Sequence, residues 1–350
     1  MNVSELYKLT VWVSEKIEIT QIPQLYHALY QVLSQNSTQA SQLPLEPQKE
    51  SLIVALKNVN LERLTRDQIT FLKEVGIAEY VSEEGINNIA DILYKNGLDV
   101  ATAAQRFQEI YQKISEGVTK SNQIKTGLSN IPISEDYELD NQVLMRVTFT
   151  GEAKMEDVKD FKNWGEIWYD IGRGIAIAND ATPEDIKIIG ASRGSIVIEF
   201  AVIAKIATTT SAIIWSALKL AEKVLDLLKK AEDLRGMKLT NNKRALDLAK
   251  EMEETADEEK AAGINQISIE ITKQLKIKTN GEGDKSVALN KAIKNLVNFV
   301  QRGGEVDFVV PENEADAVNE DVNMKELRNK VQEIRKLEEK IKLLEHKKSD

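Results

Sequence analysis

The feature that most constrains this chain is an apolar run near its middle, at 194–218, which reads GSIVIEFAVIAKIATTTSAIIWSAL and carries only Glu199 and Lys205 as charges. Its first part alternates in the manner of a strand, and its second part has the spacing of a helix. Apolar surface of this extent is unfavourable in water. The run must therefore lie at the buried centre of a domain, or on a surface that meets a membrane or a partner.

The composition excludes several classes of function. The chain has 350 residues, a formal net charge of -10 and no cysteine. We expect no main role in nucleic-acid binding, because that affinity comes largely from Lys and Arg at phosphates. The lack of cysteine removes disulfides, thiolate nucleophiles and Cys-ligated metals. The first residues carry charges around short apolar pieces, unlike a signal peptide, so we expect a cytoplasmic protein.

The periodicity predicts a mainly α fold with a small α+β unit. Residues 1–130 have helical spacing throughout and form an all-helical domain, with Thr65 and Asp99 at N-cap positions and Gly76 at a helix stop. Within 141–235 the order strand, helix, strand, strand, helix predicts a small unit in which helices cover a central antiparallel sheet. The apolar run supplies one strand and the last helix of this unit.

The remainder divides by charge. Residues 240–310 form a charged helical region, with a brief extended piece just before Pro311, and 311–323 is an acidic linker with five carboxylates and no base. Residues 324–350 have the spacing of an amphipathic, coiled-coil-like helix.

The sequence contains no convincing catalytic or ligand-binding constellation. The two histidines, His27 and His346, lie far apart in the sequence, and no phosphate-binding P-loop motif occurs. The pair Gly172 and Gly174 falls inside a helix, where it favours close packing or a kink over a phosphate cradle. We therefore expect no enzymatic activity, no catalytic residues, no cofactor and no metal.

The C-terminal segment has the clearest periodicity of the chain. In a helix, this spacing places the apolar residues in a stripe along one side. The helix cannot bury this stripe alone, so the helix packs on its own domain or pairs with another chain, either a second copy or a different protein. Both alternatives remain open from the sequence. The residues expected to carry an interaction are Leu327, Val331, Ile334, Leu337, Ile341 and Leu344.

An alternative places the helix near 201–228 in or on a membrane. Trp215 favours an interface, and lysines follow it at 219, 223, 229 and 230. Glu199, Lys205 and the three threonines at 208–210 favour a packed protein interior instead. The membrane-contacting residues in this reading are Ile213, Ile214, Trp215 and Leu218.

The stretch from WGEIWYDIGRGIAIAND through GSIVIEFAVIAKIA, with the later NFVQRGGEVDFVVP, resembles a group of uncharacterised bacterial proteins. The turn and strand at GSIVIEF are also similar to adaptor-like domains beside effectors of bacterial conflict and phage-defence systems. This resemblance implies a bacterial protein with an interaction, scaffold or sensing role, and brings no catalytic residues. We therefore expect a non-enzymatic interaction protein that assembles through its C-terminal helix, with a pore-forming or peripheral membrane effector as the alternative.

Overall fold

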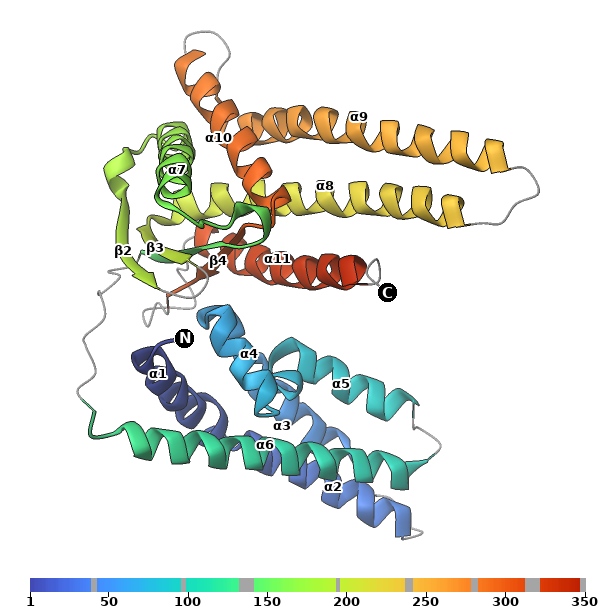
Figure 1. Ribbon diagram of the computed structural model, residues 1–350. Coiled ribbons are helices and arrows are strands. Elements are labelled where there is room, and N and C mark those ends of the chain that lie inside the picture. Colours follow the sequence, from blue (N-terminus) through green and yellow to red (C-terminus); the bar gives the residue numbers. More distant parts are fainter. Residues whose placement is uncertain are drawn as a thin grey trace. The chain divides into compact units, whose positions relative to one another are not determined.

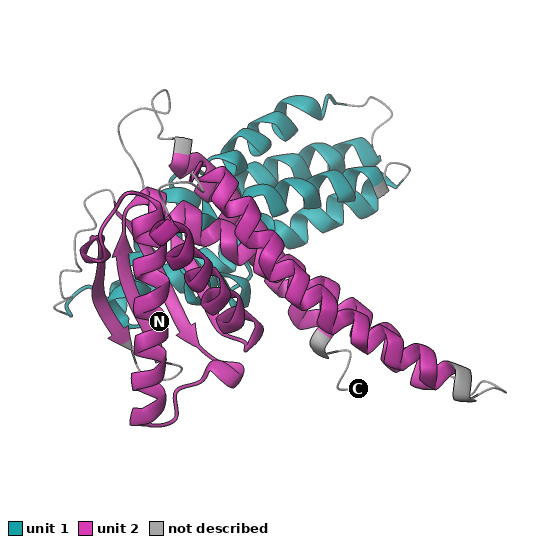
Figure 2. Ribbon diagram, turned by 90° about the horizontal axis from the view of Figure 1, so that it is seen from above, with its two compact units in different colours: residues 1–136 teal, residues 137–350 magenta. Residues whose placement is uncertain are grey.

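A computed structural model of the protein describes residues 1–38, 43–95, 99–131, 142–192, 196–236, 242–277, 283–311 and 322–346. The described chain is mainly helical with a small sheet (Figure 1), which confirms the expected fold class. It divides into two compact units, residues 1–136 and 137–350 (Figure 2). Each unit has its own hydrophobic core.

The first unit is a bundle of short helices and two long ones. Its helices are α1 (Val3–Val13), α2 (Ile22–Thr38), α3 (Glu46–Lys57), α4 (Arg66–Glu74), α5 (Ser82–Lys95) and α6 (Val100–Leu128). The predicted caps are confirmed: the side chains of Thr65 and Asp99 accept hydrogen bonds from the backbone at the starts of α4 and α6, and Gly76 has φ of 78°. The core centres on α2 and α6, where Tyr26 and Phe107 are buried.

The second unit is built on a four-stranded sheet in the order β2-β3-β1-β4, with antiparallel neighbours throughout. The strands are β1 (Val143–Phe149), β2 (Ile186–Ser192), β3 (Ile196–Val202) and β4 (Glu305–Val309). The brief extended piece expected before Pro311 is therefore the fourth strand, paired with β1. The sheet draws on residues from both 141–235 and 240–310.

One face of this sheet is apolar and packs against α7 (Val158–Ala178) and α10 (Gly283–Gln301). Its strand residues include Val147, Phe149 and Phe200, whose side chains alternate to the same face. The opposite face carries a charged row in which Arg146 is paired with Glu199, at 3.0 Å, and lies opposite Asp307 across the β1-β4 ladder. Sheet alternation thus separates the apolar core from a face that carries buried charges, because Arg146 is only 7% exposed and Asp307 only 6%.

The apolar run folds as a strand and a helix, and the strand ends two residues before the helix begins. Its strand part is β3, and its helical part opens α8 (Ala204–Gly236). Helix α8 runs side by side with α9 (Asn242–Gln274) as an antiparallel hairpin (Figure 1), each helix being about 50 Å long. The first half of α8 is buried, and its second half is only partly covered.

The last helix, α11 (Val322–His346), packs along α8. It also reaches the β4 edge of the sheet: Arg335 pairs with Asp307 at 2.8 Å and donates a hydrogen bond to the carbonyl of Phe308 at 3.3 Å. One edge of the sheet is therefore covered by a helix of the same unit.

Candidate binding groove

Helix α7 forms one wall of a groove beside the sheet. Asp157 caps its N-terminus by accepting a hydrogen bond from the backbone of Asp160 at 2.8 Å. Three turns of the helix then place Trp164 and Trp168 against the sheet, where Trp168 stacks on Phe200 with ring centroids 5.9 Å apart. These tryptophans also meet Phe149 and Phe299 edge to face. The wall is therefore held rigidly by a packed aromatic cluster.

A second stripe of α7 is left uncovered. Phe161, Gly165 and Tyr169 follow one another at four-residue intervals, so they lie on one side of the helix. Phe161 is 59% exposed and Tyr169 is 63% exposed. A Cβ atom at Gly165 would meet nothing within 4 Å, so the glycine leaves open space between the two rings.

Strand β2 forms the opposite wall. Ile188 lies opposite Phe200 in the β2-β3 ladder, so it points to the same face of the sheet as α7, and it is 70% exposed. At the closed end of the groove the helix approaches the strand closely, because a Cβ at Gly172 would lie 3.1 Å from the Cδ1 of Ile186. The expected close-packing role also applies to Gly174, where a Cβ would collide with the carbonyl oxygen of Ala288 in α10.

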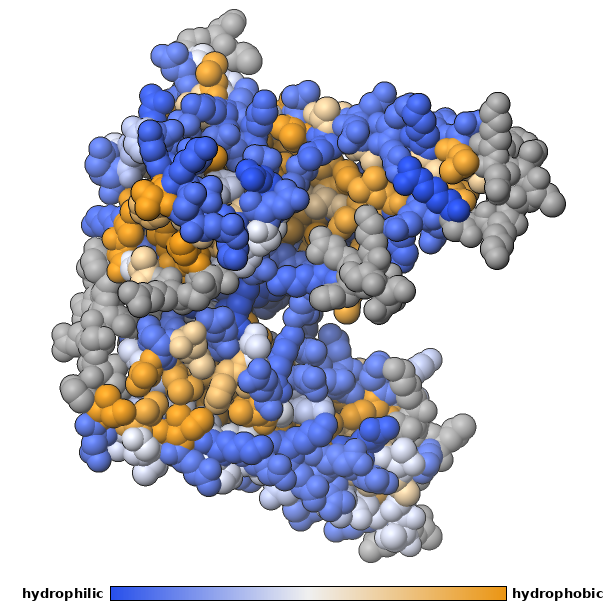
Figure 3. Space-filling model, viewed as in Figure 1, coloured by the Kyte–Doolittle hydropathy of each residue, from blue (hydrophilic) through white to orange (hydrophobic). Residues whose placement is uncertain are grey.

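These walls enclose a groove of about 260 Å³ whose floor and sides are apolar. Figure 3 shows apolar side chains gathered at the surface where α7 lies over the β2-β3 side of the sheet. The described residues that line it include Phe161, Trp168, Tyr169, Arg173, Ile186 and Ile188.

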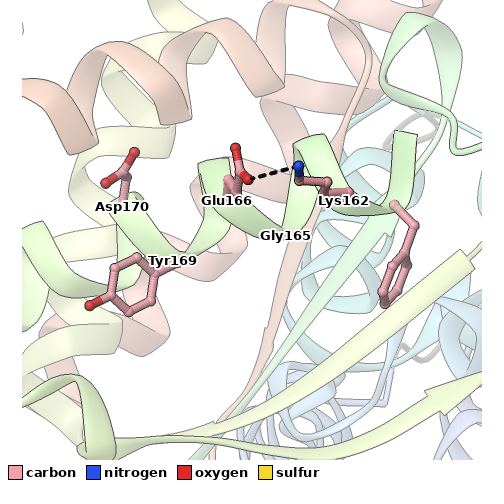
Figure 4. A pocket seen from close by; sticks show the side chains of 6 residues that line it. Lys162, Gly165, Glu166, Tyr169 and Asp170 are labelled. Carbon is pink, nitrogen blue, oxygen red and sulfur yellow. Dashed lines mark ion pairs between the residues drawn. The ribbon is translucent and has the colours of Figure 1, made fainter. Parts of the chain in front are cut away.

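The outer side of α7 is polar and paired. Lys162 and Glu166 form an ion pair at 3.9 Å, and Asp170 pairs with Lys291 of α10 at 2.8 Å. Figure 4 shows Tyr169 on the side of α7 that faces the strands, whereas Glu166 and Asp170 point to the other side. The carboxylates of Glu166 and Asp170 are therefore directed away from the groove and paired with lysines.

Two polar groups of the groove have no partner among the described residues. The exposed Arg173 makes no ion pair with them. The indole N–H of Trp168 is shielded from solvent and donates no hydrogen bond to any described group. A shielded donor without an acceptor costs about 1–3 kcal/mol, so this side chain stands to gain from an acceptor.

This arrangement suits the binding of apolar groups. The described lining provides apolar and aromatic surface, one guanidinium and one phenol, and it contains no carboxylate or histidine. Among the residues that the structure describes, no three Asp, Glu or His side chains come together as a metal site. His27 lies in the first unit between Tyr30 and Tyr111, with its ring edge-on to both.

The C-terminal stripe lies in the protein's own core. Leu327, Val331 and Ile334 are at most 1% exposed, Leu337 is 6% exposed and Ile341 is 9% exposed, and all five belong to the core of the second unit. Of the two alternatives for this helix, the structure therefore has the intramolecular one, because α8 already covers the stripe. Leu344 is half-buried, and Leu343, off the stripe, is exposed.

The residues expected to contact a membrane are also internal. Ile213 and Ile214 are at most 1% exposed and Leu218 is 5% exposed, while Trp215 is half-buried beneath the ammonium of Lys330, 4.2 Å from the ring centroid. The threonines that precede them bond to protein groups, for example Thr209 to the side-chain oxygen of Asn179 at 3.1 Å. No helix within the described ranges combines the length and apolar character needed to span a bilayer.

The sequence pattern indicated that the groove residues are apolar, but not which of them stay exposed. Phe161 belongs to the same periodic apolar set as Trp164 and Trp168, so spacing alone cannot tell which members the sheet covers. Ile188 lies on a strand whose edge position depends on the sheet order. The turn containing Arg193 and Gly194, the linker at 312–321 and most of the loop at 279–285 lie outside the described residues.

The first unit contains a second, more polar cleft. It has a volume of about 400 Å³ and lies between α5 and α6, where Lys113 donates a hydrogen bond to the hydroxyl of Tyr80 at 3.0 Å. That bond raises the pKa of Lys113. Its charged lining is exposed and closely balanced, with Asp91, Glu109, Arg106 and Lys113, so it selects no ligand class.

Comparisons with known proteins add no relative. No protein-family model matches the sequence, and no curated protein or solved structure matches it either.

Proposed function

We propose that this protein is a non-enzymatic interaction protein that binds a partner protein in the groove between α7 and β2. The observation that carries the proposal is the set of large apolar side chains left exposed on both walls: Phe161, Tyr169 and Ile188 are each more than half exposed although they adjoin a rigid core. Exposed aromatic side chains beside a pocket are typical of the buried centre of a protein interface.

Two other surfaces are weaker candidates for the same role. The α11 stripe is already covered by α8, so binding through it requires α11 to leave its own unit and expose the core. The apolar residues of α8 near Trp215 are similarly enclosed. The groove needs no such rearrangement, because its walls are open in the folded chain.

A scaffold or sensing subunit of a bacterial system would use such a groove to hold one component in place. The resemblance of GSIVIEF to adaptor-like domains supports this role, and the cytoplasm is the compartment that we propose for it. Binding then belongs to the α+β unit, and assembly through α11 is the second candidate function.

Site-specific photo-crosslinking in cells of the source organism tests the proposal. A photoreactive phenylalanine at position 169 should yield a protein adduct, whereas the same residue at position 158 should not, because Val158 is 84% exposed on the same helix but does not line the groove. Adding Ile188→Lys should abolish the adduct at position 169 while leaving the circular dichroism unchanged. Equal adducts at both positions, or an adduct indifferent to Ile188→Lys, would refute groove binding.

A further inference from the structure

The two edges of the sheet differ in what covers them. At β4, Arg335 of α11 donates to the carbonyl of Phe308, and just beyond the strand Arg328 donates to that of Pro311 at 3.4 Å. At β2, packing within the described part of the second unit comes chiefly from β3. An edge strand directs every second N–H and C=O outward, so β2 presents backbone groups along the groove that no described strand pairs.

The regular part of that edge coincides with the groove. The β2-β3 ladder is continuous from Ile186 to Ile188 and then shifts register at Gly190. A bulge twists an edge and stops pairing beyond it. Lys187, exposed between the two isoleucines, further discourages indiscriminate pairing. Pairing is therefore restricted to the segment whose isoleucines line the groove.

The regular part of β2 that borders the groove favours an extended occupant, because such a segment can pair with the outer edge of this strand. In an added strand, every second side chain points to the α7 face of the sheet. Those side chains would enter beside Phe161 and Tyr169, where the missing Cβ of Gly165 leaves space.

The polar groups indicate the charge of the occupant. Arg173 lies next to Gly172, at the end of the groove that Ile186 closes, and it makes no ion pair with a described residue. A guanidinium in this position matches a carboxylate, with which it forms charge-assisted hydrogen bonds. A carbonyl or carboxylate oxygen of the occupant could also satisfy the shielded N–H of Trp168.

Together these observations identify a kind of partner. We propose that the groove takes an extended segment of another protein that adds to β2 as a fifth strand, with apolar side chains two residues apart entering the groove and a carboxylate at Arg173. This inference rests on the proposed function, because it specifies what the same groove binds.

A displayed library of random peptides, selected on the intact protein, supplies the probe. Peptides that bind the wild type but not the Tyr169→Asp variant should have one pattern in common. This pattern is two apolar residues at positions i and i+2 and an acidic residue near them. Arg173→Gln should weaken such a peptide at least tenfold by fluorescence polarisation, and most of that loss should disappear when the acidic residue of the peptide is replaced by its amide. The control Val158→Asp should leave the affinity unchanged.

The backbone test is a scan of N-methylated peptides. Strand addition predicts losses at alternate peptide positions only, because alternate N–H groups face β2. If peptides bind the groove but tolerate N-methylation without this alternation, strand addition is wrong and the proposed function stands. If no selected peptide depends on Tyr169, and crosslinking at position 169 also fails, both proposals fall. Concentration-dependent dimerisation abolished by Tyr169→Asp would replace the peptide partner with a second copy.

Discussion

Replacing Leu327 with alanine tests how the C-terminal helix is used. Leu327 has no exposed surface and lies in the core of the second unit on the face of α11 that packs on α8. Core Leu→Ala replacements cost about 2–5 kcal/mol, from lost burial and the cavity that remains. Leu343 lies on the same helix and is 64% exposed. Leu343→Ala should therefore change the stability by no more than about 0.5 kcal/mol.

This pair is closely matched because the same chemical change is made twice in one helix, so the difference in helix propensity cancels. The assay is urea denaturation followed by tryptophan fluorescence, since three of the four tryptophans, at 164, 168 and 215, lie in the second unit. Leu327→Ala should lower the unfolding midpoint at every protein concentration. Equal midpoints for the two variants would refute burial within the chain. A loss that vanishes at high concentration would show that the stripe is covered by a second copy.

Two further predictions concern α7 and the contact between α8 and α11. Gly174→Ala should destabilise the second unit by about 1–3 kcal/mol, because its Cβ would collide with the carbonyl of Ala288. Gly165→Ala should instead stabilise it by up to about 1 kcal/mol, because the same change in helix propensity meets open space; thermal unfolding that ranks the two variants alike would contradict this. The hydrogen bond from Lys340 lowers the pKa of Glu222. That ion pair stabilises the folded chain above the unfolded Glu pKa of about 4.3, and the effect is lost as the pH falls through the lowered pKa. Lys340→Gln should therefore cost stability at pH 7, less than Leu327→Ala does, and almost none at pH 2, as measured by urea titration at both pH values.

Local signals predicted the local structure of this chain. Thr65 and Asp99 cap α4 and α6 because a side-chain oxygen before an apolar periodic segment satisfies an otherwise unpaired N–H. The period of the apolar residues alone separated the strand half of the apolar run from its helix half. In the structure, β3 ends at Val202 and α8 begins at Ala204. The most apolar window of the sequence spans this junction, so it belongs to two elements and no single helix carries its full hydropathy.

Long-range pairing could not be predicted in the same way. Strand β4 is only five residues long, and its sequence does not predict that it pairs with β1. The stripe of α11 shows that Leu327 and Ile334 must be buried, but a period cannot say whether the covering surface is α8 or another chain. The groove depends on both kinds of information, because Phe161 and Ile188 become neighbours only after the sheet order is known.

The groove shares its floor with the core, and this links binding to stability. Trp168 and Phe200 line the groove and also stack within the aromatic cluster that joins α7 to the sheet. A replacement at either position would weaken the fold as well as the floor, so a loss of binding there would not identify a contact. Phe161, Tyr169 and Ile188 add surface without being buried, and their substitution separates the two effects. An occupant that binds only the folded state should raise the free energy of unfolding by about 2.7 kcal/mol when its free concentration is one hundred times its dissociation constant. That gain should be retained in Val158→Asp and lost in Tyr169→Asp, because only the second change reaches the groove.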